Sequence, residues 1–199
     1  MNKGRLEAFS DGVLAIIITI MVLELRAPHG NQLADLQPLL PVFVSYVLSF
    51  IYVGIYWNNH HHFLHAATRV DGRVLWANLH LLFWLSMFPF ATAWMGEHHD
   101  AATPVAVYGV MLMMAAIAWL PFQSSLMRAS GRDSTLSRAV DPWGWKSVLP
   151  VALYMTGIAL AFVNTWAAQA LYALVAAMWI VPDRRIEHRL QDTVHHEQA

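Results

Sequence analysis

The chain has 199 residues, of which 57% are hydrophobic and only 13% carry a charge. Because soluble domains contain about a quarter charged residues, this composition indicates a protein embedded in a membrane. The formal net charge of −1 gives no general attraction to nucleic acid, so no nucleic-acid partner is expected. The chain has no cysteine, and its redox compartment therefore cannot be inferred from the sequence.

Long uncharged runs show where the chain can cross a bilayer. A spanning helix needs about 20 mostly apolar residues, and the runs 36–68, 74–96, 101–127 and 147–182 all reach that length. The last run has 36 residues, which is too many for one helix. Polar residues near its middle, at Asn164, Thr165 and Gln169, indicate a turn between two short helices. The first run, 12–23, is too short alone and must be extended by charged residues.

Six transmembrane helices are therefore predicted in one all-α domain over residues 1–190, followed by a polar tail over 191–199. In chain order we expect the helices at roughly 6–26, 39–63, 74–95, 103–127, 147–163 and 166–182. Pro38 fits the first turn of the second helix. Pro89 and Pro121 lie inside the third and fourth helices and are expected to bend them.

The basic residues gather on one side of this arrangement, and Arg26 alone falls on the other. The positive-inside rule places the basic side, with both termini, in the cytoplasm of a multi-pass plasma-membrane protein. Glu7 and Asp11 interrupt the first apolar stretch and no small-residue cleavage site follows, so a cleaved signal peptide is not expected. The residues assigned to the basic side are Lys3, Arg5, Arg69, Arg73, Arg128, Arg132, Arg138, Lys146, Arg184, Arg185 and Arg189.

The first helix is unusual because charged residues stand at both of its ends. At 100° per residue, one side of it carries a stripe within about 80° of arc. Such a stripe is often ordinary helix packing, but a helix this short in apolar length is poorly suited to lipid. It is better suited to the centre of an assembly, where water reaches both ends. The stripe consists of Arg5, Phe9, Gly12, Ile16, Thr19 and Leu23, with Ile20 at its margin.

Three segments together resemble the transmembrane-protein-175 family of bacterial and lysosomal potassium channels. RLEAFSDGVLAIIITIMVLEL (5–25) is similar to the R-x-x-x-F-S-D first helix of that family. GIYWNNHHHFLH (54–65) resembles the end of its second helix, and RVLWANLHLLFWLSMFPFATAWMGEH (73–98) resembles its third. The likeness is specific over residues 1–100 and is mostly one of hydropathy afterwards.

The resemblance implies a homotetramer of six-helix chains in which the first helices line a central pore. No T-V-G-Y-G filter is present. By resemblance, a hydrophobic constriction or gate falls at Ile16, Ile20 and Leu23, and a hydroxyl layer for selectivity falls at Thr19. Such a pore would pass potassium and other monovalent cations, with a modest preference for potassium over sodium, without a cofactor or catalytic activity.

The same resemblance implies a polar network that ties the first helix to its neighbours. Its partners on the second and third helices would be His60 or His61 together with Asn78, because the run HHH leaves the register open. Asp11 points about 100° away from the stripe and is expected to bond to Arg5 or to one of these histidines. The motif residues of the network on the first helix are Arg5, Phe9, Ser10 and Asp11.

Eleven histidines also raise the alternative of a histidine-metal membrane enzyme. His61 and His65 have the i, i+4 spacing of helical metal ligands. The other clusters fall at different depths and sides, and no Glu-x-x-His pattern supplies carboxylates, so we expect no catalytic metal and only incidental zinc at these two residues. A proton-coupled or ion-coupled secondary transporter is the other alternative, although the chain shows no internal repeat of the kind such proteins carry.

Overall fold

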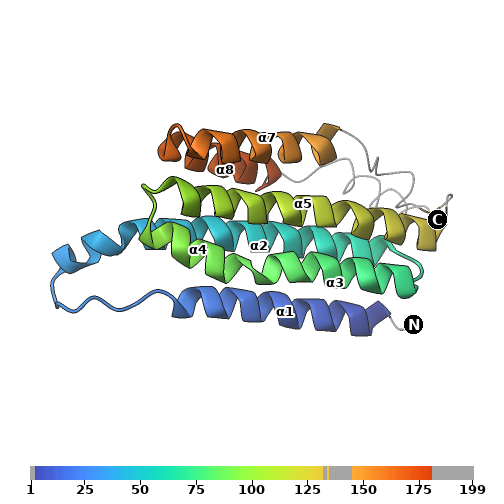
Figure 1. Cartoon of the computed structure of the whole chain (residues 1–199). Helices are drawn as coiled ribbons and strands as arrows, with labels where there is room; N and C mark the ends of the chain where they lie inside the picture. The colour runs from blue at the N-terminus through green and yellow to red at the C-terminus, as the bar shows by residue number, and fades with distance from the viewer. Residues whose placement is uncertain (1–2, 132–133, 135–144, 181–199) are drawn as a thin grey trace, which may run out of the picture.

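A computed structural model describes residues 3–131, 134 and 145–180, and all of its regular elements are helices. The predicted tail 191–199 lies outside the described residues. Figure 1 shows the helices running roughly parallel or antiparallel to one another along one long axis. In chain order they are α1 (Lys3–Leu23), the 3-10 helix η1 (Leu33–Leu39), α2 (Leu40–Ala66), α3 (Gly72–Ser86), α4 (Phe88–Glu97), α5 (Ala102–Ser130), α7 (Trp145–Ala161) and α8 (Thr165–Ile180).

Four helical segments are long and apolar enough to cross a membrane, namely Lys3–Leu23, Leu33–Ala66, Gly72–Glu97 and Ala102–Ser130. Two shorter apolar helices follow, Val148–Ala161 and Thr165–Ile180. The described residues thus confirm an all-α membrane protein. The turn between the last two helices is fixed by Asn164, whose side-chain Oδ1 accepts a hydrogen bond from the Ala167 amide at 3.0 Å.

The third predicted helix is in fact two helices, because α3 ends at Ser86 and α4 begins at Phe88. Pro89 stands in the first turn of α4, where its missing N–H leaves no helical bond unmade. Its ring would clash with the carbonyl of Leu85 in a continuous helix, which explains the break directly before it. Pro121 acts differently, because α5 continues past it to Ser130.

The helices pack in layers with α5 near the middle (Figure 1). The pair α7 and α8 covers one side of α5, while α2, α3 and α4 separate it from α1 on the other side. Close approach of α8 requires glycine, because a Cβ at Gly109 or Gly157 would overlap the side chain of Tyr172. Within the described part of the chain, α1 packs mainly against α2, α3 and α4, and it lies at the edge of the bundle.

Candidate functional site

Helix α1 has one buried face and one open face. The buried face repeats every three to four residues and consists of Leu6, Ser10, Leu14, Ile17 and Met21. The predicted stripe lies on the other face, where Phe9, Ile16, Ile20 and Leu23 are 52%, 59%, 42% and 75% exposed. A Cβ placed on Gly12 would meet nothing within 4 Å. We call Phe9, Gly12, Ile16, Thr19, Ile20 and Leu23 the open stripe, since the single chain leaves it without packing partners.

Thr19 supplies the polar atom of the open stripe. Its hydroxyl donates a hydrogen bond to the Ala15 carbonyl one turn earlier, at 2.8 Å. The hydroxyl hydrogen is therefore occupied within the helix, and the oxygen lone pairs remain available on the exposed side. An oxygen held in this way can accept from water or contact a cation.

A buried polar network joins α1 to α3 and α2 near the basic end of the bundle. Asn78 of α3 donates from Nδ2 to the Ser10 Oγ at 3.0 Å, and Ser10 in turn donates to the Leu6 carbonyl at 2.9 Å. The Asn78 Oδ1 lies 2.8 Å from the His60 Nε2 of α2. Ser10 and Asn78 are fully buried and His60 is 2% exposed, so the network is shielded from solvent.

The network selects one histidine from the run HHH and fixes its tautomer. Because the Asn78 Oδ1 can only accept, the Nε2 of His60 carries the proton. The ring stacks on Phe122 of α5 with centroids 5.0 Å apart and an 8° interplanar angle. Its buried Nδ1 has no hydrogen-bond partner among the described residues. The register left open by the sequence is thus resolved in favour of His60.

His61 has a different position, on the exposed side of α2. Its Nδ1 lies 3.1 Å from the Glu7 Oε1 of α1, and both side chains are partly exposed. Such a surface pair contributes about 0–1 kcal/mol when the imidazole is protonated. The Lys3 Nζ adds hydrogen bonds to the carbonyls of His65 and Ala67, each at 3.2 Å. These contacts hold the start of α1 against the end of α2.

Asp11 has a partner that sequence reasoning missed. Its Oδ1 accepts a hydrogen bond from the Trp57 Nε1 of α2 at 3.0 Å, and among the described residues Asp11 forms no hydrogen bond with Arg5 or a histidine. Arg5 itself is exposed. The sequence contained one indication of this partner. Trp57 lies four residues before His61 and therefore shares with it the helix face that was expected to contact the first helix.

For the pore that the family resemblance implies, replacing Asp11 by alanine is expected to weaken assembly or alter pore opening while leaving ion selectivity unchanged. The change removes the hydrogen bond to Trp57, which contributes about 1 kcal/mol. Size-exclusion chromatography and bi-ionic recordings would measure the two properties. Trp57→Phe removes the same bond from the other side and should have the same effect. Normal assembly combined with altered selectivity would instead place Asp11 in the ion path.

The histidines do not converge on a metal centre in the described part of the chain. No group of three or more histidine, aspartate and glutamate side chains there could hold a metal ion. The rings of His61 and His65 are stacked with centroids 6.1 Å apart, so a zinc ion at this pair would have two protein ligands. His80 is occupied by a hydrogen bond from the Trp84 Nε1 at 3.0 Å.

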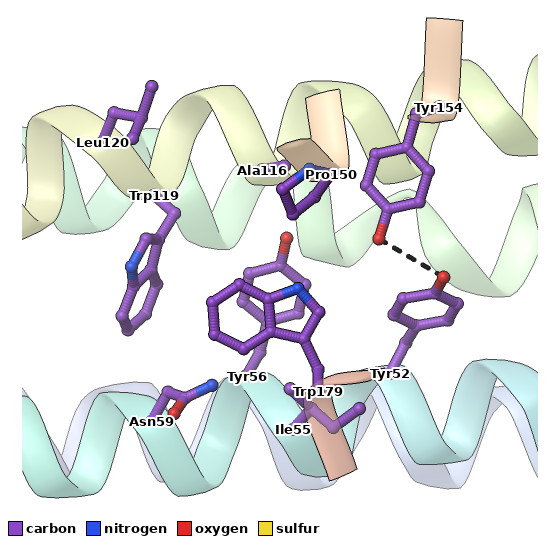
Figure 2. Close-up of a pocket in the computed structure, with 10 residues that line it drawn as sticks. All are labelled: Tyr52, Ile55, Tyr56, Asn59, Ala116, Trp119, Leu120, Pro150, Tyr154 and Trp179. Carbon is purple, nitrogen blue, oxygen red and sulfur yellow. Dashed lines mark hydrogen bonds between the residues drawn. The ribbon is translucent and has the colours of Figure 1, made fainter. Parts of the chain in front are cut away.

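An aromatic cavity of about 50 Å³ lies between α2, α5, α7 and α8, away from α1. Figure 2 shows the Tyr154 hydroxyl directed at that of Tyr52, to which it donates a hydrogen bond at 3.3 Å. Trp119 and Trp179 form other walls of the cavity. Because α1 takes no part in this cavity, it is separate from the open stripe and the polar network.

Comparison with known proteins shows that the sequence is similar to a family of channels. The family described as endosomal/lysosomal potassium channel TMEM175 matches residues 5–89, a range that includes α2, α3 and all but the first two residues of α1. A protein of Chryseobacterium sp. (strain P1-3), named a potassium channel, is 53% identical over 192 residues, covering 96% of this chain and 100% of that protein. The chain belongs to the TMEM175 family. A Streptomyces collinus protein, also named a potassium channel, is 35% identical over 197 residues, covering 92% of this chain and 95% of that one.

The fold of this TMEM175 family member also matches a solved structure. The crystal structure of a lysosomal potassium-selective channel TMEM175 homolog from Chamaesiphon minutus superposes with a TM-score of 0.75 at 26% identity. The match covers 90% of this chain and 96% of that one. The expected resemblance is therefore confirmed, and so is the expectation that the protein is not an enzyme, since the family and these relatives are channels.

Proposed function

We propose that this chain is a potassium-permeable cation channel in which the α1 helices of several copies surround a central pore. The observation that carries the proposal is the open stripe of α1. One chain leaves this face without a packing partner, at the edge of the bundle, while the opposite face is fixed to α2, α3 and α4. A single helix cannot enclose an ion path, and several copies arranged around an axis can. The potassium-channel names of the relatives support conduction of potassium, and a homotetramer is the assembly that the family resemblance implies.

The open stripe has the chemistry of a hydrophobic gate. Rings of Ile16, Ile20 and Leu23 would bring apolar side chains to the axis, and a narrow apolar ring blocks ions by expelling water. Between them, a layer of Thr19 oxygens would offer weak dipoles to a partly dehydrated cation. Because hydroxyl dipoles are a weak field, the preference for potassium over sodium would be modest. Lys3, Arg5 and the other basic residues would place both termini in the cytoplasm.

Replacing Thr19 by valine is expected to lower the potassium-to-sodium permeability ratio by about threefold, since each lost oxygen contact is worth roughly 0.5–1.5 kcal/mol. Bi-ionic reversal potentials of purified protein in planar bilayers would measure the ratio. Thr156→Val is the matched control, because Thr156 is also exposed and also bonds the carbonyl one turn earlier, at 2.9 Å, but lies on α7. An unchanged ratio in Thr19→Val would remove this residue from the selectivity layer.

Flux in liposomes tests the function as a whole. A channel dissipates a potassium gradient without any coupled ion, provided that an ionophore for a second ion compensates the charge. A secondary transporter, in contrast, needs a gradient of its counter-ion. Potassium flux that appeared only with an imposed proton or sodium gradient would overturn the channel proposal in favour of a transporter.

A further inference from the structure

A basic hollow lies between the start of α3 and the end of α5, at the end of the bundle that holds the N-terminus (Figure 1). Its volume is about 340 Å³, which falls in the range of small-ligand pockets. We call it the α3–α5 hollow. Among the residues that line it are Arg73, Ala77, Pro121, Ser124, Ser125 and Arg128.

The charge of the α3–α5 hollow is positive. Arg73 and Arg128 are exposed, and the single ion pair within the described residues joins His61 to Glu7, so neither guanidinium is paired with a carboxylate there. Asp71 also borders the hollow. Its Oδ1 accepts hydrogen bonds from the amides of Arg73 and Val74, each at 3.0 Å, and it therefore caps the N-terminus of α3. The hollow is thus lined by two guanidinium groups and by one carboxylate, whose Oδ1 already accepts two backbone hydrogen bonds.

The walls of the α3–α5 hollow change from charged to apolar along its length. On α5, Arg128, Ser125 and Ser124, and Pro121 follow one another at helical spacing on one face, from the helix end toward the bundle interior. On α3, Ala77 lies one turn beyond Arg73. The two serine hydroxyls donate to carbonyls of their own helix, at 3.3 and 2.9 Å, and their oxygens remain free to accept. Trp76, 76% exposed on α3, is a residue type that favours the membrane interface.

We propose that the α3–α5 hollow binds the headgroup of an anionic phospholipid. Arg73 and Arg128 would hold the phosphate oxygens, because guanidinium groups match phosphate geometry. The acyl chain would lie along Ala77 and Pro121. A soluble phosphate would contact only the arginines and leave Ala77 and Pro121 uncovered, whereas a lipid would contact both the basic and the apolar residues. Basic pockets between transmembrane helices commonly bind such headgroups. The site is distinct from the open stripe, and lipid binding there is a property separate from the proposed ion conduction.

Native mass spectrometry of the full-length protein from liposomes with equal phosphatidylglycerol and phosphatidylcholine tests this site. The wild type is expected to retain phosphatidylglycerol preferentially. Arg73→Gln and Arg128→Gln should each lower that retention about fivefold, the effect of one basic residue near an anionic surface. Arg69→Gln is the matched control, because Arg69 is an exposed arginine at the same end that does not line the hollow, and it should have little effect.

Three outcomes would overturn the lipid site. The first is equal retention of the two lipids by the wild type. The second is an equal loss of retention in Arg69→Gln and in the two test variants. The third is displacement of phosphatidylglycerol by millimolar inorganic phosphate, which would indicate a site for soluble anions. If the glutamine variants fail to fold, Arg73→Lys with Arg128→Lys keeps the charge and should retain a weakened preference for phosphatidylglycerol, and an undiminished preference would contradict the guanidinium contacts.

Discussion

Replacing Ile16 by asparagine is expected to raise potassium flux into liposomes at least about tenfold, which corresponds to lowering the barrier by about 1.4 kcal/mol. The substitution puts a polar amide where each copy would present an apolar side chain to the axis. Water then remains in the constriction, and the cost of bringing a hydrated ion through it falls. Fluorescence-based potassium flux, normalised to the amount of reconstituted protein, measures the effect.

The control for this experiment is Leu174→Asn on α8. Leu174 is 59% exposed, the same fraction as Ile16, but it lies on the opposite side of the bundle from α1. Its substitution should leave flux unchanged. Equal increases in both variants would indicate a general leak through damaged protein and would contradict the proposed pore face. The same substitution at Ile20 and at Leu23 then identifies the ring that closes the pore, as the position with the largest increase.

Replacing Asn78 by leucine is expected to lower the midpoint of thermal unfolding by about 10 °C. The change leaves the Ser10 Oγ and the His60 Nε2 buried without their partner, at a cost of about 1–3 kcal/mol each. For a domain of this size, each kcal/mol shifts the midpoint by about 2–4 °C. Thermal melts followed by fluorescence-detected size-exclusion chromatography measure the shift and report loss of the oligomer at the same time.

Two further variants make the result specific to the network. Gln123→Leu removes another buried amide, whose Oε1 accepts one hydrogen bond from the Trp119 Nε1 at 2.9 Å and whose Nε2 has no partner among the described residues, so its loss should cost less. Combining Asn78→Leu with Ser10→Ala should destabilise the protein by less than the sum of the single changes, because the two residues share a bond. Strict additivity, or an unchanged midpoint in Asn78→Leu, would mean that the network does not hold the helices together.

Much of the fold follows from where charges are absent. Apolar length predicted the apolar helical segments, and Asn164 marked the last turn, whereas Thr165 and Gln169 lie within α8. The break between α3 and α4 was harder to predict. Pro89 indicated a distortion, but a proline inside a membrane helix can either bend it, as was expected, or end it. The local sequence around Pro89 does not distinguish these two results, and the structure shows the second, with α3 ending at Ser86 and α4 beginning at Phe88.

The candidate site shows the same division. Helical spacing was enough to group the stripe residues on one side of α1, where Phe9, Ile16, Ile20 and Leu23 are exposed in the single chain, because geometry within one helix depends on local sequence alone. The choice between His60 and His61 required the position of Asn78 on another helix. The bond from Trp57 to Asp11 was missed for the same reason, since it depends on how α1 and α2 are rotated against each other. The α3–α5 hollow joins residues about 50 positions apart, such as Arg73 and Arg128.

The break at Met87 divides the support of α1 into two unequal parts. The first half of α1 is held to α3 through Asn78, in bonds of ordinary strength that solvent cannot replace. The second half lies against α4, where its hydrogen-bonded contact is the Thr92 hydroxyl to the Met21 sulfur at 3.9 Å, and sulfur is a weak acceptor. The second half is therefore held mainly by apolar burial, since Ile17 and Met21 are 3% and 2% exposed. One helix is thus held by directional hydrogen bonds in its first half and by non-directional packing in its second, and Ile16, Ile20 and Leu23 lie in the second half.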